Sequence, residues 1–144
     1  MQYTIKTFKV SLEVCEPGEK LGSSEDVARF ARAIYKDLDA DKEHFVLLAV
    51  NIKNRVIGFK VVSTGSMTSS IVHPREVFRS ALALDAARII CVHNHPAGEP
   101  TPSPEDNLIT KLLKEGGELL KIALLDHVIL GTDRHWSYAD HKML

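Results

Sequence analysis

The 144-residue sequence contains no long hydrophobic run. Its longest apolar stretches, such as residues 46–50, are far shorter than the roughly 20 residues needed to cross a bilayer. The N-terminal region also lacks the apolar block of a secretory signal, because Lys6 and Lys9 stand among polar residues. These absences predict a soluble, cytoplasmic protein without a membrane partner.

Cysteine is scarce, since Cys15 and Cys91 are the only two in the chain. Both stand in apolar surroundings typical of strands, where a free thiol behaves as a small hydrophobic side chain. Two such residues do not form the disulfide framework on which small secreted domains depend. The core must come from the 44% of residues that are hydrophobic, enough for one domain over residues 1–144.

Neither sign of charge predominates, because 18 basic residues stand against 19 acidic ones and the formal net charge is -1. No overall positive field would therefore gather phosphate backbones. The clearest basic cluster, Lys53 with Arg55, is typical of a solvated hairpin turn. Nucleic acid is accordingly not an expected partner.

Hydrophobic residues recurring at helical spacing predict three helices. They begin at Ser23 or Ser24, at Pro74, and at Ser103 with Pro104, and each start has a residue that caps or opens a helix. The third helix is expected to end at Gly116 and Gly117. It should turn four apolar residues inward: Leu108, Ile109, Leu112 and Leu113.

Apolar and β-branched runs predict the strands, over residues 4–14, 43–50, 56–63, 67–72, 88–92, 122–130 and 135–138. The runs 43–50 and 56–63 are separated by a short polar turn, which predicts an antiparallel hairpin at the centre of the fold. The predicted fold class is α+β, a mixed α/β sandwich of about three helices on a largely antiparallel sheet.

Three residues of metal-ligating type, His93, His95 and Asp106, lie within one short stretch. Side chains two apart on a strand share a face, about 6.6 Å apart at their Cα atoms, so both imidazoles can converge on one ion. Asp106 would lie in the first turn of the third helix, where the helix dipole favours a carboxylate. The pattern predicts a site for one zinc ion.

Two imidazoles and one carboxylate leave a fourth tetrahedral position for water, as in catalytic rather than structural zinc sites. Zinc lowers the pKa of such a water to about 7, which indicates hydrolysis. A fourth protein ligand would instead indicate a structural metal. Cys91 shares the predicted strand face of the two histidines, although packing in the core explains it better.

A zinc hydrolase also needs a proton acceptor and a group that stabilises an oxyanion. Glu43 opens an otherwise apolar run, where it is either a residue beside the site or a solvated carboxylate at the end of a strand. Ser103 has an ordinary explanation as a helix N-cap. One hydroxyl can both donate and accept, so the two roles are compatible.

The spacing of His93, His95, Ser103 and Asp106 resembles the signature of the JAMM, or MPN+, metalloproteases. The surrounding sequences at residues 73–78, 93–98 and 126–129 are similar to the bacterial RadC-like branch of that family. The resemblance covers about residues 43–144. It implies a JAB/MPN-like fold of cytidine-deaminase-like architecture.

The resemblance also implies the role of each residue. Glu43 would be the general base and Ser103 would assist at the oxyanion, while zinc would be bound by His93, His95 and Asp106. Asp126 and His127 would lie near the site and orient a ligand. The other histidines are assigned no ligand role.

A protein or peptide substrate follows from the same resemblance, and its identity stays open. The family name suggests DNA repair, so an interaction module with a structural or vestigial metal is the alternative. The sequence has no room for an N-terminal helix-hairpin-helix region ahead of its first strand and helix, which weakens a DNA role. An exposed sheet edge could pair chains into homo-oligomers.

Overall fold

The computed structural model describes residues 2–7, 18–65 and 72–144. Its helices are α1 (Ser24–Tyr35), α2 (Pro74–Ala83) and α3 (Pro104–Leu120). Its strands are β1 (Glu43–Val50), β2 (Val56–Gly65), β3 (Arg88–Asn94), β4 (Ala123–Leu130) and β5 (His135–Ser137). None of the helices in these ranges is long and apolar enough to span a membrane.

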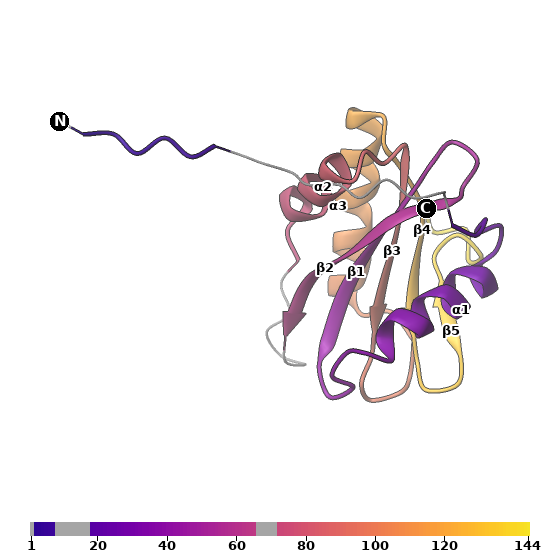
Figure 1. Cartoon of the computed structure of the whole chain (residues 1–144). Coiled ribbons are helices and arrows are strands. Elements are labelled where there is room, and N and C mark those ends of the chain that lie inside the picture. Colours follow the sequence, from indigo (N-terminus) through magenta and orange to yellow (C-terminus); the bar gives the residue numbers. More distant parts are fainter. Residues whose placement is uncertain (1, 8–17, 66–71) are drawn as a thin grey trace.

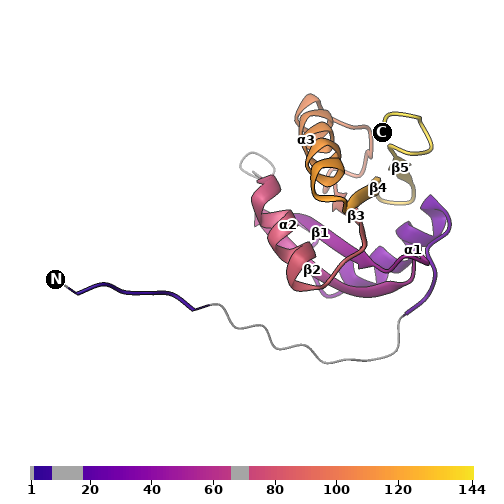
Figure 2. The ribbon, with the colours of Figure 1, turned by 90° about the horizontal axis from the view of Figure 1, so that it is seen from above.

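The five strands form one sheet in the order β2-β1-β3-β4-β5. Only β3 and β4 run parallel, and the other neighbouring pairs are antiparallel. Parallel neighbours need a long crossover connection, and α3 provides it between β3 and β4. Helix α1 covers one face of the sheet, while α2 and α3 cover the other (Figures 1 and 2). The predicted α+β class with a largely antiparallel sheet is confirmed.

Each face of the sheet has its own hydrophobic core. Alternate residues of β1, including Val46 and Leu48, pack with Ala28 and Ala31 of α1. The residues between them, including Leu47, pack toward α2 and α3 with Val77, Phe78, Ile89, Cys91 and Leu113. Strands buried on both faces are continuous apolar runs, which is why β1 and β3 are so uniformly hydrophobic.

The hairpin of β1 and β2 forms as predicted, but its position at the centre of the fold is wrong. β2 is an edge strand, and β3 is central because both β1 and β4 pair with it. Of the expected strand at residues 4–14, residues 4–7 form no strand and residues 8–14 lie outside the described part of the chain. Residues 67–71 of another expected strand also lie outside it, as does Cys15.

The expected end of the third helix at Gly116 and Gly117 is wrong, because α3 continues to Leu120. The two glycines allow close packing: a Cβ on Gly117 would lie 2.5 Å from the Ile122 carbonyl oxygen, and one on Gly116 would lie 2.8 Å from the Phe78 ring. The helix ends instead at Leu120, and the next residue, Lys121, caps it with a left-handed backbone with φ of 61°.

The inward orientation predicted for α3 is correct for Leu113, which is fully buried, and Ile109 packs against the same core. It is wrong for Leu108 and Leu112, whose exposed fractions are 60% and 41%. Both side chains border a cavity at the N-terminal half of the helix rather than the core.

Candidate metal centre

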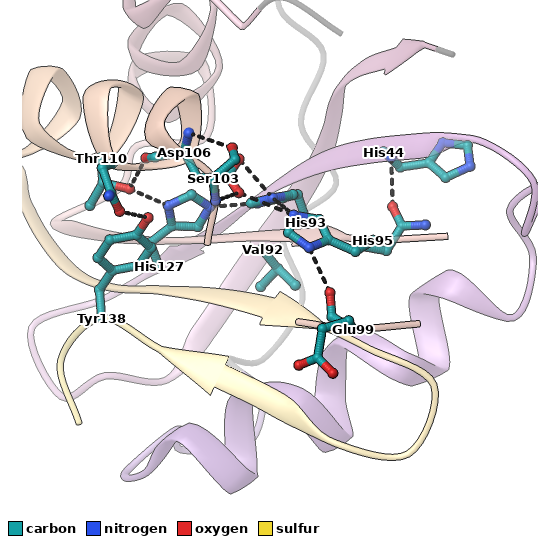
Figure 3. A network of polar contacts seen from close by, with 12 residues as sticks. His44, Val92, His93, His95, Glu99, Ser103, Asp106, Thr110, His127 and Tyr138 are labelled. Atoms are coloured by element: carbon teal, nitrogen blue, oxygen red, sulfur yellow. Dashed lines mark hydrogen bonds and ion pairs between the residues drawn. The ribbon is translucent and has the colours of Figure 1, made fainter. Parts of the chain in front are cut away.

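His93, His95 and Asp106 form one compact group, here called the His93 triad (Figure 3). His93 lies near the end of β3, and His95 follows that strand on the same face. Their Nε2 atoms are 3.0 Å apart. Each Nε2 also lies 3.1 Å from a different oxygen of the Asp106 carboxylate. The structure therefore brings the three predicted ligands together from two elements.

The His95 ring is oriented by the loop that follows it. Its Nδ1 lies 2.9 Å from the carbonyl oxygen of Glu99. A carbonyl only accepts, so Nδ1 carries the hydrogen and the Nε2 of a neutral ring keeps its lone pair. That lone pair faces His93 and Asp106, as metal coordination requires.

Asp106 is held in place by the start of α3. Its Oδ2 accepts the Ser103 N–H at 2.9 Å, and its own N–H donates to Ser103 Oγ at 3.1 Å. This reciprocal pair is a capping box, which orders the first turn of the helix. The Ser103 hydroxyl only accepts in this cap, so its hydrogen is not needed there.

The triad is strongly polarised. Burial would raise the pKa of Asp106, but imidazoles that carry a hydrogen on Nε2 donate to this carboxylate, and these hydrogen bonds from His93 and His95 hold that pKa well below its usual value. The hydrogen bond with Asp106 raises the pKa of His95. The carboxylate is thus a fixed negative charge beside two imidazoles, a favourable setting for a cation.

Glu43, at the start of β1, lines the same cavity as His93 and Asp106. The cavity has a volume of about 230 Å³. Its remaining lining is mostly apolar and comes from β1, from Val72 and from α3, including Phe45, Leu108, Ile109 and Leu112. The structure therefore places the predicted base beside two of the three predicted ligands.

Cys91 belongs to the core and not to the triad. It is fully buried among the residues that face α2 and α3, and burial raises the pKa of its thiol well above the usual value. Within the described residues, the group that contains His93 has no thiol. A closed site with Cys91 as fourth ligand is therefore not supported.

Asp126 and His127 are neighbours in β4, so their side chains point to opposite faces of the sheet. The Asp126 carboxylate accepts from the Ser137 hydroxyl and from the backbone of Ala139, away from the triad. His127 Nε2, in contrast, lies 2.7 Å from His93 Nδ1. Of this predicted pair, only His127 contacts a candidate ligand.

Sequence reasoning missed Thr110. Its hydroxyl lies 2.6 Å from His127 Nδ1 and donates to the Asp106 carbonyl oxygen at 2.7 Å (Figure 3). The available signal was its spacing, because a residue four positions after Asp106 lies on the same helix face. Tyr138 was also missed, and its ring stacks on His127 with centroids 5.1 Å apart.

A second group of metal-ligating types consists of Glu25, His135 and Asp140, here called the His135 cluster. Glu25 and Asp140 are exposed, and His135 is half-buried. The Ser24 hydroxyl lies inside this cluster, donating to Asp140 at 2.5 Å and lying 3.0 Å from His135 Nε2.

The α+β sandwich, with a His-x-His pair at a strand end and an aspartate at the start of the next helix, agrees with the JAB-type domain that the sequence resemblance implied. The family model described as "RadC-like JAB domain" matches residues 21–143, so the chain belongs to this family.

The chain is also similar to relatives named UPF0758 protein, a name that states no activity. One from Chlorobaculum parvum is 44% identical over 125 residues, covering 87% of this chain and 55% of the relative. One from Methanosarcina mazei is 47% identical over 125 residues, covering 87% and 54%. One from Bacillus licheniformis is 52% identical over 120 residues, covering 83% and 53%. The chain thus spans about half the length of these relatives.

Proposed function

We propose that this chain is a zinc-dependent metallopeptidase or isopeptidase-like hydrolase that cleaves an amide bond in a protein or peptide. The observation that carries the proposal is the convergence of two imidazole nitrogens and one carboxylate, with His93 and Asp106 lining the same cavity as a second carboxylate, Glu43. Three protein ligands of this kind are typical of catalytic zinc sites.

The triad fits zinc on its own chemistry. Two nitrogens and two carboxylate oxygens face one another at 3.0 to 3.1 Å, so one cation could take the place of the hydrogens between them. His95 already has its Nδ1 hydrogen directed to Glu99, which leaves Nε2 for the metal. His93 Nε2, His95 Nε2 and the Asp106 carboxylate would hold the ion.

Zinc bound there would supply an acidified water and polarise the substrate carbonyl. Glu43 would accept a proton from that water and pass it to the leaving amine. The Ser103 hydroxyl, whose hydrogen the helix cap does not use, would donate to the oxyanion. Burial of His93 and Asp106 limits the access of bulk water to these groups.

The cavity also indicates what the substrate presents. Leu108, Ile109 and Leu112 form an apolar wall, and the charged groups of the lining are the carboxylates of Glu43, Glu105 and Asp106. Such a lining favours an apolar substrate side chain and repels an acidic one. We therefore expect cleavage beside apolar residues.

The test is digestion of a peptide library by zinc-loaded protein. Glu43→Gln should bind zinc like the wild type but lose turnover by about 10²- to 10⁴-fold, because it removes the proton acceptor and no ligand. Glu25→Gln is the matched control, since it changes a carboxylate outside the cavity, and it should cleave normally. Undiminished cleavage by Glu43→Gln would show that the base is misassigned.

A further inference from the structure

Behind the His93 triad, a chain of three polar side chains runs from α3 through β4 to β3 (Figure 3). Thr110 lies on α3, His127 on β4 and His93 on β3. The contacts between them are 2.6 Å and 2.7 Å long, and all three side chains are buried. Contacts this short between polar atoms each require one hydrogen, so the positions of the hydrogens can be derived.

The derivation starts at Thr110, whose hydroxyl carries one hydrogen. It lies 2.7 Å from the Asp106 carbonyl oxygen, which has no hydrogen to give. The Thr110 hydrogen must therefore serve that contact. Toward His127 the hydroxyl oxygen can then only accept, so the hydrogen of the second contact lies on His127 Nδ1.

His127 is a neutral ring. It is fully buried, with the rings of Phe45 and Tyr138 at 5.4 Å and 5.1 Å, and its two nitrogens contact a hydroxyl and an imidazole rather than a carboxylate. A buried positive charge without a carboxylate partner is costly, so the ring is uncharged. A neutral imidazole with its hydrogen on Nδ1 has a bare Nε2. This nitrogen accepts from His93, so the hydrogen of that contact lies on His93 Nδ1.

We propose that Thr110 and His127 are positioning residues that fix the tautomer and ring orientation of His93, so that its Nε2 lone pair points at Asp106 and His95. The inference rests on the proposed metal site. Ligating histidines commonly donate their other N–H to a carboxylate or a carbonyl. In this chain a neutral histidine takes that place, oriented by a threonine four residues after the ligand Asp106.

The same helix thus acts on the site twice. The carboxylate of Asp106 enters the triad, and its backbone carbonyl sets the direction of the Thr110 hydroxyl. A displacement of the first turn of α3 would disturb the carboxylate and the tautomer of His93 together. The position of the first turn of α3 therefore influences which ring nitrogen of His93 carries the hydrogen.

The direct test is a long-range ¹⁵N–¹H correlation spectrum of the imidazoles in the zinc-free wild-type protein. His127 and His93 should each carry their hydrogen on Nδ1. A spectrum with the His127 hydrogen on Nε2 overturns the proposal, whether or not the protein binds zinc. This measurement does not depend on hydrolysis, so it can disprove the tautomer assignment without bearing on the proposed function.

Zinc titration of variants gives a second readout. Thr110→Val keeps the branched shape but removes the hydroxyl, and it should weaken zinc binding by about 10- to 100-fold, as loss of an outer hydrogen-bond partner does. Thr110→Ser should restore binding. Thr64→Val is the matched control, because Thr64 also bonds a buried histidine, His44, but lies outside the triad. Wild-type affinity in a folded Thr110→Val protein overturns the proposal.

Discussion

The His93 triad and the His135 cluster contain the same residue types in different surroundings. In the triad, the Nδ1 hydrogen of His95 is taken up by a carbonyl, and its Nε2 stays available. In the His135 cluster, the single Ser24 hydrogen goes to Asp140, so the Ser24 oxygen must accept from His135 Nε2. That nitrogen is therefore engaged by the protein itself.

Burial separates the two groups as well. The side chains of His93 and Asp106 are 7% and 15% exposed, while Glu25 and Asp140 face solvent. A largely buried carboxylate ordered by a helix cap, such as that of Asp106, attracts a cation with little screening. Solvent and salt screen the attraction between a cation and an exposed carboxylate. Residue type alone does not define a metal site; the positions of hydrogens and the loss of water do. The His135 cluster instead joins α1 to the C-terminal segment.

The largest effect that distinguishes the two groups is expected from removal of one carboxylate in each. Asp106→Asn should weaken zinc binding by more than the roughly 100-fold seen on loss of an outer partner, because it removes a ligand. Asp140→Asn should leave zinc affinity unchanged. Competition with a chromogenic chelator measures both, and similar losses in the two variants would make the comparison wrong.

The two serines provide a second contrast. Ser103→Ala should lower turnover by about 10²- to 10³-fold through loss of an oxyanion donor. It should also cost about 1 kcal/mol of unfolding free energy through loss of the N-cap. Peptide digestion and denaturant titration measure the two effects.

Ser24→Ala should lower the unfolding free energy by about 1–3 kcal/mol, because a buried hydroxyl with two partners is lost. Turnover should not change, since this serine belongs to the His135 cluster. A Ser24→Ala protein with normal stability and poor cleavage would reverse the roles of the two groups.

Asp126 offers a third setting for a carboxylate, buried and bonded to neutral donors. Burial raises its pKa despite the Ser137 hydroxyl and the two backbone N–H groups that donate to it. The folded protein then binds this proton more tightly than the unfolded chain does, whose pKa is near 3.9. The resulting stability is present below that pH and is lost as pH rises through the folded-state pKa.

The smallest effect that we expect is a change of stability with pH, caused by the raised pKa of Asp126. The unfolding free energy of the wild type should fall relative to that of Asp126→Asn as pH rises above about 4. Urea titrations of both proteins over that range give the difference at each pH. A difference that grows with pH would mean that the carboxylate is stabilised in its charged form, as Asp106 is.

Local sequence predicted those parts of the site that depend on local geometry. His93 and His95 share a face because of strand alternation, and Ser103 with Asp106 forms a cap because of helix-start chemistry. His127 was identified only through the resemblance to RadC-like proteins. Its contact with His93 requires the parallel pairing of β3 with β4, which local patterns do not determine.

Two misread features of α3 have physical reasons. Gly116 and Gly117 usually signal the end of a helix, but here their missing side chains allow contact with Phe78 and Ile122. Leu108 and Leu112 have the spacing of core residues, yet that stretch of the helix borders the cavity. In both cases tertiary packing overrides a sound local pattern.

The most direct test of the metal site is anomalous diffraction at the zinc edge from crystals of the zinc-loaded protein. A single zinc per chain is predicted, bound by His93 Nε2, His95 Nε2 and the Asp106 carboxylate, with the remaining position open to water. Zinc in the His135 cluster, or zinc bonded to the sulfur of Cys91, would contradict the assignment.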